Sequence, residues 1–153
     1  MGFKAIRIGR LAGIPIGFQP LWLAIVALIT WSLGAVYYPD EVAGIAPLAA
    51  YALGLLSALL LFASILLHEL GHALVARRNG VEIEEIDLWL LGGVARMAGY
   101  PKTADAELRF AIAGPAVTAV IAALFGAAAL ALPDSAPAAL RAVVVYQALV
   151  NAA

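Results

Sequence analysis

The sequence predicts an α-helical polytopic membrane protein with three full transmembrane helices, the start of a fourth, and a small β-sheet at the cytoplasmic membrane face. Three observations lead to this fold class. Hydrophobic residues make up 65% of the 153 residues, and charged residues only 12%, whereas a soluble domain carries about 25% charged residues. Long uncharged runs alternate with short polar segments. One polar segment, residues 81–102, is rich in β-forming residues and glycine. At this length we expect one domain, residues 1–153.

Four apolar runs define the expected helices. The first covers residues 21–38 and the second residues 47–78, which begin at a proline, a favourable first helical residue. Asn79-Gly80 then provides a typical helix stop. The third run covers about residues 108–132, and the fourth begins near residue 138 and continues to the last residue. The first three are long enough to cross a bilayer.

The polar segments between these runs predict the remaining elements. Residues 1–20 alternate partly and contain glycine and proline, which indicates a strand or hairpin at the membrane surface. Residues 81–102 predict two or three short strands. Residues 39–41 are expected to form a turn, and Thr103 or Asp105 to cap the third helix. The acidic side chains of the strand segment are expected to be solvated: Glu82, Glu84, Glu85 and Asp87.

Positive charge is concentrated on one side of the expected topology. Loops on the N-terminal side hold eight of the nine Lys and Arg residues, and the other side holds only Arg141. The positive-inside rule therefore places the N-terminus and residues 77–107 in the cytoplasm of a multi-pass protein of the cell membrane, with the lipid bilayer as its surroundings. The net charge of −1 gives no basic surface for nucleic acid, so no nucleic-acid partner is expected. The absence of cysteine excludes disulfides and thiolate metal sites.

The only two histidines, His68 and His72, enclose the sequence HELGH inside the second apolar run. Positions i and i+4 of a helix share a face, so both imidazoles can reach one ion. The pattern is the zinc-hydrolase arrangement, which predicts His68 and His72 as Zn²⁺ ligands and Glu69 as the general base and then acid. The alternative is a polar pair packed against other helices, but ionisable groups in a bilayer cost several kcal/mol and are seldom kept without a role. Gly71 leaves room for a close helix contact or for substrate near the metal.

HELGH and the apolar run before it resemble the site-2 protease family of intramembrane zinc metalloproteases, of the archaeal and bacterial type. Residues 91–97 (LGGVARM) resemble the glycine-containing β-loop of that family beside its active site, and residues 110–115 (FAIAGP) resemble its alanine-glycine-proline motif. Residues 6–23 are also similar, so the resemblance covers essentially the whole chain. It implies a zinc endopeptidase that cleaves a membrane-protein substrate in or near its span.

Gly92 and Gly93 have two interpretations. They can form an ordinary turn, or they can bring an exposed strand edge near the metal. A substrate span must unwind before it is cut, and a strand edge can hold the unwound segment by β-augmentation. The resemblance favours the second interpretation, in which Gly92 and Gly93 bind substrate. Gly114-Pro115 is interpreted as helix-entry and close-packing chemistry rather than as part of a site.

The resemblance also implies a third zinc ligand, an Asp from a later helix in a segment similar to N-x-x-P-x-x-P-x-D-G, which this sequence lacks. The four Asp residues are expected in loops or flanks, and Thr118 stands where many relatives have Asn. We therefore expect these residues to be the N-terminal part of a metalloprotease core, truncated before its third ligand. The alternative from another class is a non-enzymatic membrane scaffold for metal binding or transport, or an inactive relative of the protease.

Overall fold

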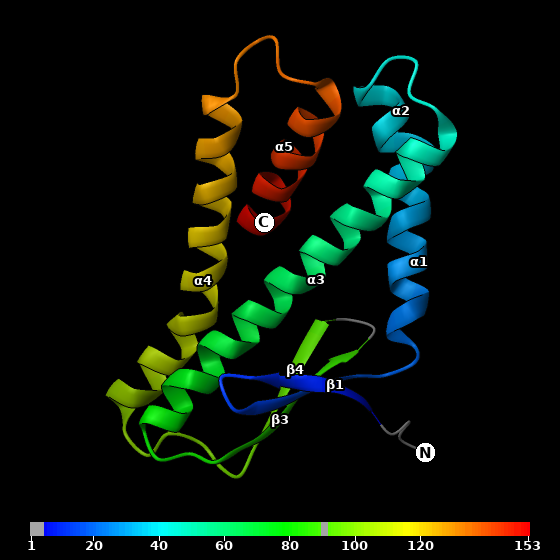
Figure 1. Cartoon of the computed structure of the whole chain (residues 1–153). Coiled ribbons are helices and arrows are strands. Elements are labelled where there is room, and N and C mark those ends of the chain that lie inside the picture. The colour runs from blue at the N-terminus through cyan, green and yellow to red at the C-terminus, as the bar shows by residue number, and fades with distance from the viewer. Residues whose placement is uncertain (1–4, 90–91) are drawn as a thin grey trace. The chain divides into compact units, whose positions relative to one another are not determined.

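The computed structural model describes residues 5–89 and 92–153 (Figure 1). Its contacts divide the chain into two compact units. The first, here called the sheet unit, comprises residues 1–24 and 65–118, and the second, here called the helical unit, comprises residues 25–64 and 119–153. All residues of the expected metal site belong to the sheet unit.

The order of elements agrees with the predicted fold class. Three stretches of the described residues are long and apolar enough to cross a membrane: Trp22–Glu41, Pro47–Arg78 and Ala104–Ala131. A shorter apolar helix follows them, as expected for the start of a fourth. The elements are β1 (Ile6–Leu11), β2 (Ile14–Phe18), α1 (Trp22–Ser32), a π-helical segment η1 (Leu33–Tyr37), α2 (Tyr38–Glu41), α3 (Pro47–Arg78), β3 (Ile83–Trp89), β4 (Gly92–Met97), α4 (Ala104–Ala131) and α5 (Ala138–Ala152).

Two predicted helix ends are confirmed and one predicted turn is wrong. Gly80 follows α3 with a φ of +79°, and its N–H donates to the carbonyl of Arg77 at 3.1 Å, so the predicted stop ends the helix. Thr103 caps α4, because its Oγ1 accepts the N–H of Ala106 at 3.2 Å. Residues 39–41 form α2 instead of a turn. Pro39 lies near the start of α2, which continues directly from η1.

The four strands form one sheet in the order β1-β2-β3-β4. β1 pairs with β2 and β3 with β4 in antiparallel fashion, whereas β2 and β3 are parallel. A parallel pair needs a crossover connection, and α1 to α3 provide it. Strand β4 lies at the edge of the sheet, so one side of its backbone has no neighbouring strand of the sheet.

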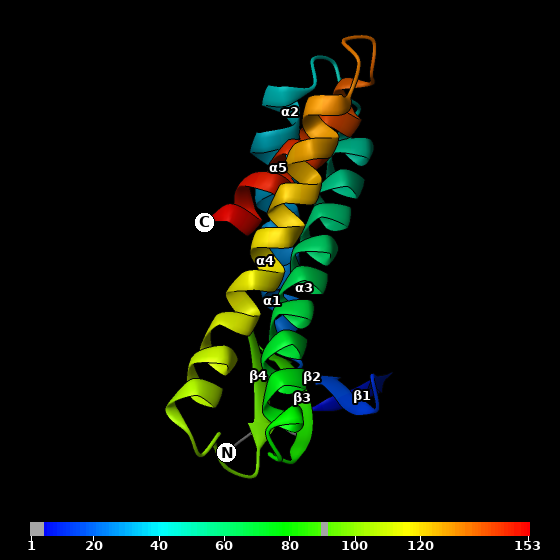
Figure 2. The same cartoon turned by 90° about the vertical axis from the view of Figure 1, so that its left-hand side faces the viewer.

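One face of the sheet packs against the C-terminal part of α3 (Figure 2). Ile14 and Ile16 of β2 and Ile86 of β3 are buried there with Ala73 of α3. Alternation along the strands sends the other side chains to the opposite face. The hydrophobic face of the sheet therefore fixes the strands against the helix that carries HELGH.

The opposite face of the sheet carries a row of ion pairs. Arg96 binds Glu85 at 2.9 Å and Asp87 at 2.8 Å, and Arg7 approaches Glu85 at 3.5 Å. The side chain of Asp87 is only 3% exposed, so its predicted solvated position in a loop or flank is wrong. Register explains the burial, because Asp87 is in the middle of β3 opposite Gly17 of β2, which has no side chain to displace it.

Buried polar contacts join the helices of the helical unit. The hydroxyls of Tyr38 in α2 and Ser57 in α3 are hydrogen-bonded to each other. Gln147 of α5 donates to the carbonyl of Ser57 at 2.9 Å, and Tyr37 donates to the carbonyl of Ala142 at 3.0 Å. Because polar groups in an apolar environment are costly unless paired, these bonds favour one packing of α5 within the unit.

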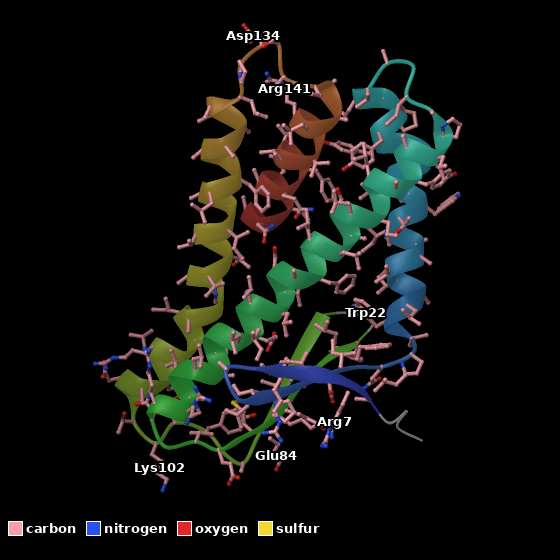
Figure 3. All side chains as sticks on the ribbon, viewed as in Figure 1. Arg7, Trp22, Glu84, Lys102, Asp134 and Arg141 are labelled. Atoms are coloured by element: carbon pink, nitrogen blue, oxygen red, sulfur yellow. The ribbon has the colours of Figure 1, made fainter. Side chains whose placement is uncertain are left out.

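The loop between α4 and α5 is tied down by Arg141. Its guanidinium donates to the carbonyl of Pro133 at 2.9 Å. Figure 3 shows Asp134 and Arg141 at this loop. The positive charge also suits the carbonyl end of α4.

Candidate metal centre

Helix α3 places His68 and His72 one turn apart on the same face. Their Nε2 atoms are 3.1 Å apart, and their rings meet edge to face with centroids 4.8 Å apart. Both imidazoles therefore converge on one point, as their i, i+4 spacing predicts.

His72 is oriented by α4. Its Nδ1 lies 2.7 Å from the carbonyl oxygen of Phe110, to which it donates a hydrogen bond. The Phe110 ring also packs against the imidazole with centroids 4.9 Å apart. This bond selects the tautomer that leaves the Nε2 lone pair available to a metal, which is the usual arrangement around ligating histidines.

The two nitrogens fit zinc. Two ligand nitrogens that each lie ~2.0–2.1 Å from one tetrahedral Zn²⁺ are separated by roughly 3.3 Å, and the observed separation is 3.1 Å. Over residues 5–89 and 92–153, no group of three His, Cys, Asp or Glu side chains is placed to hold a metal ion. Among the described residues, His68 and His72 are therefore the two side chains that could hold a zinc ion.

Glu69 is held by strand β4. The backbone N–H of Ala95 donates a hydrogen bond to its carboxylate, and Gly93 approaches its aliphatic stem. The N–H of Ala95 consequently faces the open edge of β4 rather than β3. Backbone N–H and C=O groups of successive residues in a strand point to alternate sides, so those of Gly93 point to the same edge as those of Ala95. The open edge of the sheet therefore lies beside Glu69, the candidate base.

A cavity of ≈240 Å³ joins these groups. It unites the predicted ligand His68, the predicted base Glu69 and the predicted substrate residues Gly92 and Gly93, while His72 adjoins it through His68. Leu91, the first residue of the LGGVARM motif, lies outside the described residues. The full lining consists of Ile65, His68, Glu69, Gly92, Gly93 and Thr118.

Three residues at this site were not predicted from the sequence. Ile65 precedes His68 by three positions, and this helical spacing alone could have placed it on the same face. Phe110 and Gly114 come from α4, and Gly114 lies against both imidazoles. The interpretation of Gly114 as a packing residue alone is therefore incomplete. The FAIAGP motif was the sequence feature that could have indicated Phe110 and Gly114, but it did not show which of its residues face the histidines.

A HExxH helix with paired imidazoles in a helical membrane fold is the arrangement typical of a membrane zinc hydrolase. The chain belongs to peptidase family M50, the site-2 protease family, whose model matches residues 56–152. Family membership supports a zinc metalloprotease and a multi-pass membrane protein.

Individual relatives agree with this family. The chain is 45% identical over 128 residues to the zinc metalloprotease Rip3 of Mycobacterium tuberculosis, which covers 84% of this chain and 32% of the relative. It is 43% identical over 118 residues to the zinc metalloprotease sll0528 of Synechocystis, which covers 76% of this chain and 30% of the relative. The chain thus spans about a third of the length of these relatives.

The fold also matches a solved structure. The site-2 protease from Methanocaldococcus jannaschii superimposes with a TM-score of 0.61 at 29% identity, over 97% of this chain and 63% of that chain. The resemblance drawn from HELGH and the two glycine motifs is therefore confirmed at the level of family and fold.

Proposed function

We propose that this chain is the zinc-binding part of an intramembrane endopeptidase that cleaves a membrane-protein substrate in or near its span. The observation that carries the proposal is the 3.1 Å separation of the two imidazole nitrogens beside a cavity that also contains Glu69. His68 and His72 would hold the ion. When bound, zinc supplies Lewis-acid polarisation and lowers the pKa of water toward ~7.

Glu69 carries the proton in this proposal. Its carboxylate takes a proton from the water that attacks the peptide carbonyl carbon, and it then gives a proton to the departing amide nitrogen. The hydrogen bond from the Ala95 N–H helps to hold the Glu69 carboxylate, and Glu69 lines the cavity. Proton transfer would therefore take place at the wall of the cavity that Glu69 lines.

The open edge of β4 would present the substrate. Gly93 and Ala95 expose backbone groups there beside Glu69, so an unwound segment added as a fifth strand would pass the base. Gly92 and Gly93 would contribute the side-chain-free surface that lets the substrate backbone approach. Membrane proteins with an unwound span are the substrate class that this edge suits.

The third ligand stays a prediction. Family resemblance suggests an Asp outside these 153 residues, and two imidazoles alone would hold zinc weakly. Tests of activity therefore use the full-length protein. The prediction that the N-terminus faces the cytoplasm is likewise part of this proposal.

The test replaces Glu69 with Gln in the full-length protein, reconstituted in liposomes with a panel of tagged single-span reporter proteins. We expect Glu69→Gln to keep about one zinc per chain and to lower reporter cleavage by roughly 10²–10⁴-fold, the usual contribution of a general base. Glu84→Gln, at an exposed carboxylate of β3, is the control and should cleave as the wild type does.

Two results would overturn the proposal. Cleavage by Glu69→Gln at the wild-type rate would remove the assigned base. Zinc content that is unchanged in His68→Ala would remove the assigned ligand, and metal flux without cleavage would instead support the non-enzymatic alternative.

A further inference from the structure

Gly114 of α4 lies directly against both imidazoles. A Cβ atom at this position would lie well under 3.0 Å from the Nε2 atoms of His68 and His72, a distance that real Cβ atoms essentially never show. These are the same two nitrogens that converge for metal binding. Only a residue without a side chain leaves that space open.

The His72 imidazole is anchored to α4. His72 is bonded through Nδ1 to the carbonyl of Phe110, which is in the same helix as Gly114. The backbone is equally restricted, because a Cβ on Gly71 of α3 would already lie 2.9 Å from the carbonyl oxygen of Ala113. Helices α3 and α4 are therefore in close contact near the histidines, and they cannot move apart without losing the contact at Gly71 and the bond from His72 to Phe110.

Gly93 of β4 has a matching relation to Glu69. A Cβ on Gly93 would lie inside 3.0 Å of the Glu69 Cγ atom. The carboxylate of Glu69 is meanwhile held by the N–H of Ala95 in the same strand. A methyl group on Gly93 would consequently push the stem of Glu69 away while leaving the histidines untouched.

We propose that Gly114 and Gly93 are positioning residues with separate tasks. Gly114 keeps open the space in which the two imidazole nitrogens meet the metal, and Gly93 sets the position of the Glu69 carboxylate. The inference rests on the proposed function for the identity of the metal and the base. It predicts that the same small change, glycine to alanine, affects metal binding at one position and proton transfer at the other.

The first experiment measures zinc in the full-length protein by elemental analysis and by competition with a chromogenic chelator. Gly114→Ala should weaken zinc binding by about 10–100-fold, the range typical when the support of a metal ligand is disturbed. Gly126→Ala is the matched control, because it is in the same helix and a Cβ there meets nothing within 4 Å. It should bind zinc as the wild type does.

The second experiment measures Gly93→Ala with a reporter that the wild type cleaves. Gly93→Ala should keep about one zinc per chain and lower kcat at least about tenfold, as expected for a misplaced general base. Gly9→Ala, in strand β1 with open space around it, is the control. Unchanged kcat, or loss of zinc together with kcat, would contradict the assignment.

A thermodynamic cycle keeps the steric claim testable even if Gly114→Ala accumulates poorly. The methyl group should destabilise the metal-free protein when both imidazoles are present, and much less in a His68→Ala, His72→Ala background. Equal destabilisation in both backgrounds would show that the clash is elsewhere and overturn the inference.

If the wild type binds no zinc, the proposed function fails. If the wild type and Gly114→Ala bind zinc equally well, only this inference fails.

Discussion

At the scale of single residues, Asp87 shows how a local pattern can mislead. One of its carboxylate oxygens accepts a hydrogen bond from Arg96 at 2.8 Å, while the other is buried with no hydrogen-bond partner among the described residues. Burial and the neighbouring Glu85 raise its pKa above the ordinary value, and the opposing effect of Arg96 does not fully offset them. The buried carboxylate therefore favours its protonated form more than a solvated one would.

This shift predicts a pH dependence of stability. Because the pKa is raised in the folded chain, the folded state binds this proton more tightly than the unfolded state. The resulting stabilisation is present below the unfolded pKa and is lost as the pH rises through the folded pKa. Asp87→Asn removes the titration, so the Tm of the wild type relative to this variant should rise as the pH falls from about 7 to about 4.

Thermal unfolding in detergent, followed by circular dichroism, measures this difference. Comparing two chains that share all other titrating groups removes the common acid effects. Glu84→Gln, an exposed carboxylate in the same strand, serves as the control substitution. A difference between the wild type and Asp87→Asn that stays level or decreases toward low pH would contradict the assigned shift.

At the scale of elements, the contact between α3 and α4 in the sheet unit brings the site together. Gly71 faces the carbonyl of Ala113, and a Cβ there would lie 2.9 Å from that oxygen and 3.0 Å from the Val117 side chain. Of the two roles considered for Gly71, the structure favours the close helix contact. The same contact carries Phe110 and Gly114 to the histidines.

We therefore expect Gly71→Ala to destabilise the chain by about 1–3 kcal/mol, because the methyl group meets a backbone carbonyl that cannot rotate away. Gly126→Ala should instead be neutral or stabilising by up to about 1 kcal/mol, since it gains helix propensity and has open space. Thermal unfolding of both variants in the same detergent tests the contact. A Tm of Gly71→Ala at or above that of Gly126→Ala would show that the helices are not in close contact.

At the scale of the whole molecule, charge determines the expected orientation in the membrane. Eight of the nine basic residues belong to segments on the N-terminal side, and Arg141 belongs to the other. Acidic residues contribute little to this rule. Substitution of acidic residues can therefore report the orientation without changing it.

These 153 residues contain no cysteine, so a cysteine introduced into them can report the orientation. Glu84 on β3 and Asp134 in the α4–α5 loop are exposed and are labelled in Figure 3. In intact cells, a membrane-impermeant maleimide should label Asp134→Cys and leave Glu84→Cys unlabelled until the membrane is permeabilised. The opposite pattern would place the N-terminus outside the cytoplasm.

Features that depend on local geometry could be predicted from the amino-acid sequence. A bilayer-spanning helix needs about 20 apolar residues, so the apolar runs predicted all three spans. The spacing of His68 and His72 placed both imidazoles on one face, because four residues complete about one helical turn. The distant groups that complete the site became evident only from the packing of the helices. Phe110, 38 residues from His72, and Gly114 reach the histidines through close packing of two helices. That packing depends on the shapes of many side chains at once, and no single stretch of sequence records it.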